Sequence, residues 1–132
     1  MTTVVLVEDD ADIRELTTLM LEAEGWQVHA YETGTPALAH CLQSPPDLVV
    51  LDCMLPEISG LGILRRLRAQ PITALVPVVM VSALADPSNV EAALHAGAQD
   101  FLAKPFTRAN LVAVVRQHLG RPAVETRLLA IA

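Results

Sequence analysis

The sequence predicts an α/β fold, a doubly wound parallel sheet of five strands flanked by five helices. Short apolar runs alternate five times with stretches of helical periodicity, an order that builds a parallel sheet with helices on both faces. Hydrophobic residues make up 52 % of the chain and aromatic residues only 3 %, so the core is aliphatic, as in strands buried on both faces. The length of 132 residues fits a single domain.

Five apolar runs are the expected strands. They are short, and three of them are rich in valine, which favours strands over helices. The runs cover residues 4–7, 27–30, 48–51, 78–81 and 101–103.

The first expected helix lies between the first two runs. Ile13, Leu16, Met20 and Ala23 keep the spacing of an amphipathic helix, and Gly25 is a suitable C-terminal stop.

Four further helices are expected over residues 35–43, 59–69, 87–96 and 107–119. Their ends carry typical signals for helix starts and stops. These signals are Pro36 in the first turn of the second helix, Pro87 and Gly97 at the two ends of the fourth, and Thr107 as N-cap of the fifth. The apolar residues on the inner side of the fifth helix are Leu111, Val115 and Leu119.

Charge and cysteine content exclude several classes of protein. The net charge is −6 and the cations are scattered, so we expect no direct nucleic acid binding by this chain. No segment has the length of a membrane span, and the first residues lack the pattern of a signal peptide. Cys41 and Cys53 have no metal-ligand spacing, so two buried, reduced thiols in a cytoplasmic protein are expected.

Polar residues follow the predicted strands where a ligand is expected. In open parallel sheets, ligands bind beyond the carboxyl ends of the strands. The polar residues there are Glu8, Asp9 and Asp10 after the first run, Asp52 after the third, Ser82 after the fourth and Lys104 after the fifth.

These residue types suit phosphoryl transfer onto a carboxylate. Converging carboxylates raise one another's pKa, and a Mg²⁺ ion with its preference for oxygen ligands relieves the repulsion. A carboxylate such as Asp52 can attack phosphorus and form an aspartyl phosphate. The transferred group then needs its oxygens neutralised, by Mg²⁺, by Lys104, which is the only lysine of the chain, and by the Ser82 hydroxyl.

Each of these features also has an ordinary structural explanation. An acidic triplet after a strand is often a solvated turn or a helix start, a serine there is often an N-cap, and a Lys-Pro pair is often a turn. Asp52 is the least ordinary, because an ionised carboxylate at the end of an apolar strand needs a partner. Their convergence on one sheet edge favours a functional site.

Four ordered segments now identify a family resemblance. Over about residues 3–120 the chain resembles the bacterial response-regulator receiver domain of two-component systems. The matching segments are VVLVEDDADIREL, PDLVVLDCMLPEISGLGILRRLR, VPVVMVSALAD and AGAQDFLAKPF. The resemblance implies a flavodoxin-like sheet with strand order 2-1-3-4-5, a receiver domain over residues 1–121 and a C-terminal tail or linker over residues 122–132.

The resemblance also implies a phosphoacceptor and a metal site. Asp52 corresponds to the phosphorylated aspartate. Asp9, Asp52 and the backbone carbonyl of Met54 correspond to direct Mg²⁺ ligands, and Glu8 acts on the ion through water. Asp10 lies one place beyond the acidic pair and is expected to start a helix.

The remaining motif residues correspond to a switch. Ser82 is similar to the hydroxyl that turns toward the phosphoryl group, and Phe101 to the aromatic ring that swings inward behind it. Lys104 is similar to the phosphate-contacting lysine, and the bond from Lys104 to Pro105 is expected to be cis.

The expected function is a binding switch. A sensor histidine kinase or phosphotransfer protein donates the phosphoryl group, and an output domain or downstream protein reads the change. As in the family, the chain is expected to catalyse only its own Mg²⁺-dependent phosphorylation and dephosphorylation, with homodimerisation on phosphorylation as an option.

The charged dimer surface of the DNA-binding subfamily is incomplete here. The fourth helix has Glu91 and His95 but no Lys or Arg, and the fifth has Asn110 and Val114 where charges are usual.

Other classes of protein remain as alternatives. A phosphatase or mutase on a similar fold would carry a second Asp two residues after the nucleophile, but Met54 stands there and cannot act as an acid or base. An unphosphorylated pseudo-receiver scaffold is disfavoured by the intact site residues. A flavin-binding module is disfavoured because no phosphate-binding loop rich in Ser, Thr or Gly follows the first strand.

Overall fold

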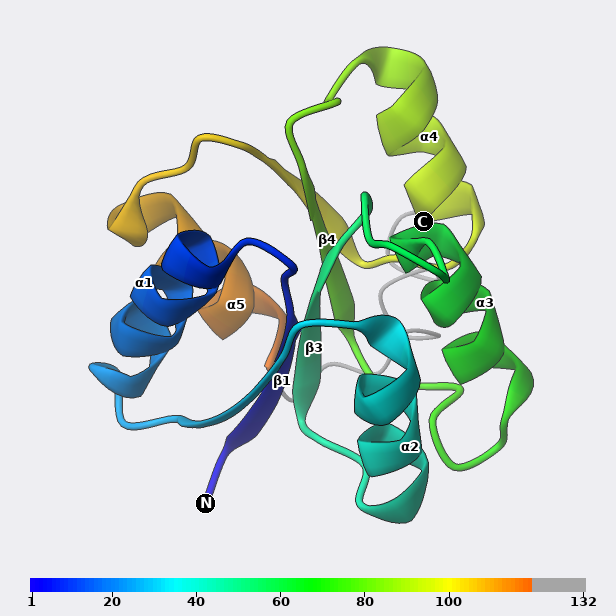
Figure 1. Ribbon diagram of the computed structural model, residues 1–132, viewed down its shortest axis with the longest axis horizontal. Coiled ribbons are helices and arrows are strands. Elements are labelled where there is room, and N and C mark those ends of the chain that lie inside the picture. The colour runs from blue at the N-terminus through cyan, green and yellow to red at the C-terminus, as the bar shows by residue number, and fades with distance from the viewer. Residues whose placement is uncertain (120–132) are drawn as a thin grey trace.

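The computed structural model describes residues 1–119 and has five strands alternating with five helices over that range (Figure 1). The elements are β1 Thr3–Val7, α1 Ala11–Glu22, β2 Gln27–Tyr31, α2 Gly34–Gln43, β3 Leu48–Asp52, α3 Gly60–Ala69, β4 Val78–Ser82, α4 Pro87–His95, β5 Asp100–Ala103 and α5 Arg108–His118. All strand pairs are parallel, and the order is β2-β1-β3-β4-β5. The predicted fold class and strand order are therefore confirmed.

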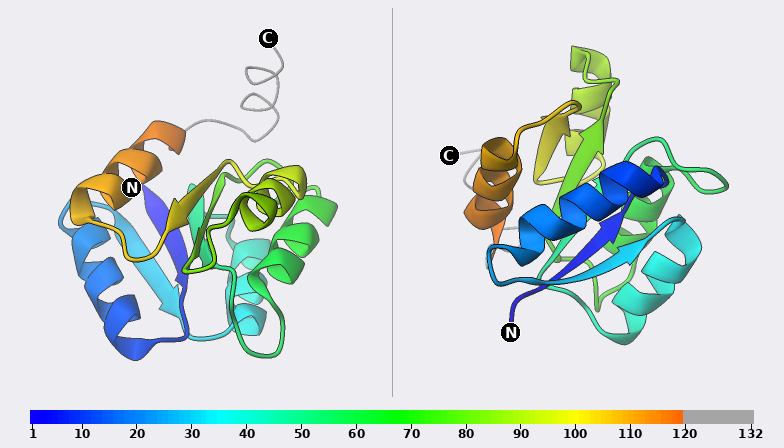
Figure 2. Two further views of the ribbon diagram at one scale, coloured as in Figure 1. Left: turned by 90° about the horizontal axis from the view of Figure 1, so that it is seen from above. Right: turned by 60° about the vertical axis from the view of Figure 1, so that its left-hand side comes forward.

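Helices cover both faces of the sheet, as Figure 2 shows from two directions. One buried apolar cluster joins α2, α3 and α4 to one face, and a second joins α1 and α5 to the other. The period of two along β1 explains this division, because Val5 and Val7 enter the first cluster while Val4 and Leu6 enter the second. Both faces of the central strands are therefore buried, which agrees with the predicted aliphatic core.

The inner face of α1 differs from the predicted stripe. Thr17 and Leu21 are its buried residues, whereas Leu16 is 54 % exposed and Ala23 follows the helix as an exposed cap. The apolar spacing indicated a helix correctly but not its rotation, because Thr17 packs inward despite its hydroxyl. Leu16 is left on the surface near Phe106.

Side-chain caps set three of the helix starts. Asp10 accepts a hydrogen bond from the Ile13 backbone N–H at 3.0 Å, so it begins α1 as predicted. Thr107 caps α5 through Asn110 N–H in the same way, and Ser59 caps α3. The predicted helix at residues 59–69 therefore begins one residue later, with Ser59 outside it.

The cysteines are only partly as predicted. Both thiols are free, but Cys41 is buried while Cys53 is half-buried beside Asp52. Burial raises the pKa of each thiol to about 11. Both are therefore protonated at neutral pH and unreactive as thiolates.

Several polar and charged side chains near α5 have partners within the chain. Glu24, just after α1, binds Arg108 at 3.2 Å and also binds Arg116. Buried His118 approaches Asp100 at 2.9 Å between Nε2 and Oδ2.

None of the helices over residues 1–119 has the length and apolar character needed to cross a membrane.

Candidate functional site

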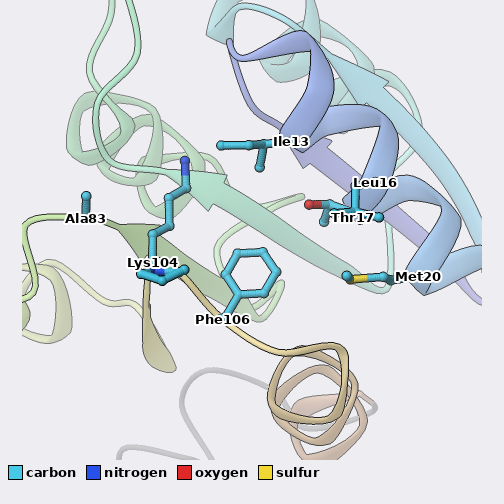
Figure 3. A pocket seen from close by; sticks show the side chains of 8 residues that line it. Ile13, Leu16, Thr17, Met20, Ala83, Lys104 and Phe106 are labelled. Carbon is cyan, nitrogen blue, oxygen red and sulfur yellow. The ribbon is translucent and has the colours of Figure 1, made fainter.

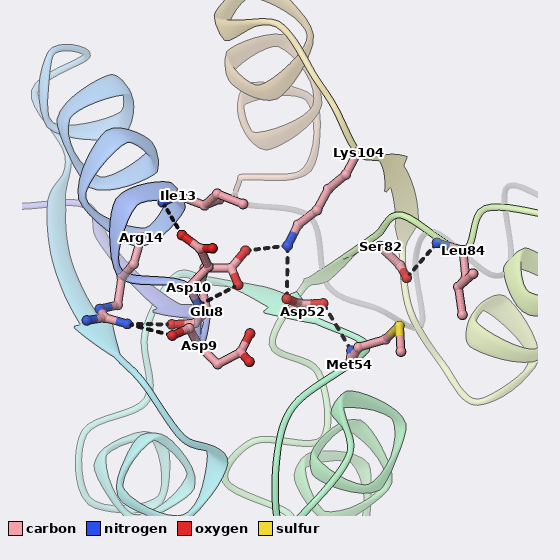
Figure 4. A network of polar contacts seen from close by, with 10 residues as sticks. All are labelled: Glu8, Asp9, Asp10, Ile13, Arg14, Asp52, Met54, Ser82, Leu84 and Lys104. Atoms are coloured by element: carbon pink, nitrogen blue, oxygen red, sulfur yellow. Dashed lines mark hydrogen bonds and ion pairs between the residues drawn. The ribbon is translucent and has the colours of Figure 1, made fainter.

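The predicted site residues meet at the carboxyl edge of the sheet (Figure 4). Asp52 is the last residue of β3 and is 5 % exposed. Glu8 follows β1 directly and is buried, and Lys104 follows β5. The parallel topology places these three strand ends at one edge, since β1 pairs with β3, β3 with β4 and β4 with β5.

Lys104 connects two of the carboxylates. Its Nζ lies 2.5 Å from Glu8 Oε1 and 2.9 Å from Asp52 Oδ2. The peptide bond between Lys104 and Pro105 is cis, as predicted. The ammonium therefore sits where a group transferred onto Asp52 would need a positive charge.

Burial and crowding shift the ionisation of this cluster. The pKa of Glu8 is raised to about 7, mainly by burial, with Asp52 adding to the shift and the hydrogen bond from Lys104 opposing it. For Lys104, burial lowers the pKa, but its hydrogen bonds to Glu8 and Asp52 outweigh this and leave the pKa raised. The cluster therefore holds a firmly charged lysine beside a carboxyl that ionises near neutrality.

Three carboxylates are close enough to hold one metal ion. One oxygen from each of Glu8, Asp9 and Asp52 lies within 4.8 Å of the others. Asp9 is exposed and can take an ion from solvent, while Arg14 donates to the backbone carbonyls of Glu8 and Asp9 and fixes the loop that carries them. The oxygen-only donor set fits Mg²⁺, which binds few protein carboxylates and keeps several waters.

The loop after β3 closes tightly over Asp52. The Met54 backbone N–H donates to Asp52 Oδ1 at 3.0 Å, and Gly60 N–H donates to the Cys53 carbonyl at 3.0 Å. A Cβ on Gly60 would stand only 2.1 Å from the Asp52 carbonyl oxygen. Sequence reasoning missed both Arg14 and Gly60, although a glycine at a helix start is a signal of close backbone approach.

Ser82 and Phe101 lie on neighbouring strands beside this site. Ser82 is buried at the end of β4, and its Oγ accepts from the Leu84 N–H at 3.0 Å. It borders a cavity of about 260 Å³ between α3 and α4. Phe101 of β5 is opposite Met80 and packs, partly buried, against the apolar core. The structure therefore brings Ser82 to the site and places Phe101 further back, so the switch role stays a prediction.

An apolar depression opens next to Lys104, with a volume of about 390 Å³ (Figure 3). Side chains of α1 form one wall, and the segments after β4 and β5 form the other. The lining residues are Ile13, Leu16, Thr17, Met20, Ala83, Lys104, Pro105 and Phe106. An exposed apolar surface beside a polar site is typical of a docking surface for another protein.

The ionisation of Glu8 predicts how stability depends on pH. Its pKa rises from 4.5 to about 7 on folding, so the protonated form favours the folded state. Without Mg²⁺, we expect Glu8 to make its full contribution to the free energy of unfolding below about pH 4.5. That contribution should decline as pH rises through 7. Denaturant unfolding at several pH values measures the slope of the free energy of unfolding against pH. Glu8→Gln, which resembles the protonated carboxyl, is expected to flatten this slope.

Mg²⁺ is expected to act in the opposite direction, because it binds ionised carboxylates and stabilises the folded chain more at higher pH. Asp9→Ala is expected to lose the Mg²⁺ effect and keep the slope. Equal slopes in the parent chain and Glu8→Gln would show that Glu8 is not the titrating group.

The sequence matches one family over nearly all of its described part. The match covers residues 4–116, and the family is described as the response regulator receiver domain. A transcriptional regulatory protein, CseB of Streptomyces coelicolor, is 44 % identical over 120 residues, which are 91 % of this chain and 50 % of CseB. The chain therefore spans about half the length of the curated relatives it matches.

Solved structures with the same architecture include receiver domains. A putative response regulator from Chloroflexus aurantiacus superposes with a TM-score of 0.87 at 36 % identity, covering 91 % of this chain and 98 % of that one. The receiver domain of sensor histidine kinase PA1611 from Pseudomonas aeruginosa has a TM-score of 0.84 at 32 % identity, covering 90 % and 98 %. That structure holds a magnesium ion in its active-site cleft.

Proposed function

The chain belongs to the response regulator receiver domain family, the phosphoacceptor switch of two-component systems, and from that premise we propose that Asp52 is its phosphoacceptor. One observation carries the proposal. The Asp52 carboxylate ends a buried strand and has both a lysine ammonium and two further carboxylates within reach. A carboxylate so placed can accept a phosphoryl group, because partners for the phosphoryl oxygens are already in place.

The proposed reaction is an in-line displacement at phosphorus. An Asp52 carboxylate oxygen forms the new bond to phosphorus, and the bond from phosphorus to a histidine nitrogen of the donor breaks. The electron pair returns to the imidazole of the donor, which takes a proton from solvent. Lys104 Nζ, already 2.9 Å from Asp52, moves to a phosphoryl oxygen and gives up its contact with Glu8.

We propose that Asp9, Asp52 and the Met54 carbonyl would hold Mg²⁺ directly, with Glu8 acting through water. Bound Mg²⁺ would neutralise charge on the phosphoryl oxygens during transfer. The close carboxylates of this chain and the magnesium ion in the related Pseudomonas domain support the assignment.

We further propose that the chain catalyses nothing beyond its own phosphorylation and dephosphorylation. A phosphatase or mutase on a similar fold would carry a second Asp two residues after the nucleophile as its acid or base, but Met54 stands there and is 58 % exposed. A thioether cannot transfer protons, so Met54 cannot take that role.

The phosphoryl donor is proposed to be a histidine kinase or phosphotransfer protein that docks on the apolar depression. Its histidine must reach Asp52, so its surface covers the adjoining residues of α1 and the segment after β5. Leu16, exposed at that wall, would be buried in the complex. This proposal gives the exposed leucine a role that folding alone does not.

Leu16→Glu is therefore expected to slow phosphotransfer from a protein donor at least tenfold, because the complex would bury a charge. Phosphorylation by acetyl phosphate, which needs no docking, should stay unchanged. The matched control is Leu94→Glu on α4, an exposed leucine away from the depression. If both variants slowed transfer equally, or if Leu16→Glu had no effect, the docking surface would lie elsewhere.

Ser82 and Phe101 are proposed to form the two-state switch. A phosphoryl group on Asp52 brings negative charge and acceptor oxygens, and Ser82 can leave Leu84 N–H to donate to one of them. The movement opens space behind β4, into which the Phe101 ring can turn. A free-energy difference of a few kcal/mol between the two conformations is enough for phosphorylation to shift the population from one to the other.

The switch predicts two different side-chain positions. Structures with and without a phosphoryl mimic on Asp52 should show new rotamers for Ser82 and Phe101, and Ser82→Ala should leave Phe101 outward in both. Identical rotamers in the parent chain with and without the mimic would exclude this mechanism, even if Asp52 is phosphorylated.

The output of the switch is proposed to lie outside this domain. We propose that residues 1–121 form the receiver domain. Residues 122–132, which lie outside the described residues, are proposed as a tail or linker. The place of action is proposed to be the cytoplasm. Arg108 and Arg116 are already paired with Glu24, so a homodimer of the phosphorylated chain is proposed to use other contacts.

A further inference from the structure

Two histidines and the only tyrosine gather at the edge of the sheet farthest from β5. His29 and Tyr31 are two residues apart on β2 and point to the same side, toward α2, which carries His40. The rings of His29 and His40 have centroids 4.6 Å apart and are tilted by 58°. The Tyr31 backbone carbonyl accepts from the Glu8 N–H at 3.0 Å, but the side chains of His29, Tyr31 and His40 have no role in the phosphoacceptor site described above.

Tyr31 controls the orientation of the His40 ring. Its hydroxyl is hydrogen-bonded to His40 Nδ1. When Nδ1–H donates to that oxygen, the lone pair of the neutral ring lies on Nε2, on the opposite side. A polar partner on one ring nitrogen is the arrangement that orients metal-ligating histidines.

The spacing of the two rings suits one shared metal ion. A Zn–N bond is about 2.0–2.1 Å, so two imidazoles on one tetrahedral Zn²⁺ have centroids roughly 5.2 Å apart. The observed centroid separation is 4.6 Å, so the two rings would part slightly to share the ion. Tyr31 and His40 also line an open depression of about 520 Å³, so an ion and its waters can reach His40.

We propose that His29 and His40 form a second metal site, oriented by Tyr31, for a borderline divalent cation such as Zn²⁺. Imidazole nitrogens select this class of ion, whereas Mg²⁺ prefers the oxygens near Asp52. Water completes the coordination shell. The bound ion would tie the edge strand β2 to α2 and stabilise the folded chain.

A Zn²⁺ titration of the ¹⁵N-labelled full chain in excess Mg²⁺ tests the site. The Nε2 resonances of His29 and His40 should shift together and saturate at one Zn²⁺ per chain, while those of His95 and His118 stay in place. His29→Gln and His40→Gln should each weaken binding at least tenfold. Tyr31→Phe, which keeps the ring and loses the hydrogen bond, should weaken it about tenfold.

The matched control is His95→Gln on α4, which should bind Zn²⁺ as the parent chain does. Affinity unchanged in both His29→Gln and His40→Gln would overturn the proposal, as would Zn²⁺ shifts confined to the carboxylates near Asp52. If His40→Gln does not fold, His29→Gln and the parent chain decide the question, because His29 lies on the exposed edge strand.

Discussion

Gly60→Ala is expected to be among the most damaging single substitutions in the domain. The added Cβ would stand 2.1 Å from the Asp52 carbonyl oxygen and 2.7 Å from Cys53 Cα, both backbone atoms that cannot rotate away. The loop between β3 and α3 must therefore move, which breaks the hydrogen bond from Gly60 N–H to the Cys53 carbonyl. We expect a loss of about 3 kcal/mol or more in the free energy of unfolding, measured by denaturant titration.

Gly62→Ala provides a matched control two residues along the same helix. Its Cβ would meet only side-chain atoms, at 3.1 Å from Ile58 Cγ2 and 3.4 Å from Ser59 Oγ. Alanine is favoured over glycine inside a helix by about 1 kcal/mol, which offsets the tight contact. A Gly60→Ala chain as stable as Gly62→Ala would contradict the close approach described for the phosphoacceptor loop.

Asp52→Asn is expected to abolish phosphoryl uptake. An amide is not a nucleophile toward phosphorus, so no aspartyl phosphate can form at residue 52. The fold should persist, because the amide oxygen of the variant can still accept from Met54 N–H and the repulsion with Glu8 is removed. Intact-mass spectrometry after incubation with Mg²⁺ and acetyl phosphate measures the result.

Asp10→Asn serves as the matched control for that experiment. Asparagine caps a helix as well as aspartate does, so α1 keeps its start and phosphorylation should proceed as in the parent chain. A phosphoryl group still gained by Asp52→Asn would place the acceptor elsewhere in the chain.

Much of the site could be predicted because strand ends are easy to locate. The alternation of apolar runs and helices fixes a parallel sheet, and the sheet then brings Asp52, Ser82 and Lys104 to one edge whatever the exact bounds of the elements. The acidic pair at Glu8 and Asp9 follows from the same rule. The distances and the bridging position of Lys104 required the structure.

Two kinds of feature could not be predicted: how a helix is rotated about its own axis, and which residues far apart in sequence contact each other. Apolar spacing identified α1, but whether Leu16 or Thr17 faces inward depends on how the helix packs on the sheet. The pairing of Glu24 with Arg108 joins residues 84 apart in sequence. His29 and His40 meet across two elements without any motif, so no sequence signal could indicate their contact.

The most direct test of the central claim is peptide mapping of the wild-type chain by mass spectrometry, after incubation with Mg²⁺ and acetyl phosphate. Phosphorylation at Asp52 predicts one phosphoryl group per chain, located on the peptide that contains residue 52 and absent when Mg²⁺ is removed. A phosphoryl group located instead on Asp9, Asp10 or Ser82, or uptake that does not depend on Mg²⁺, would contradict the account.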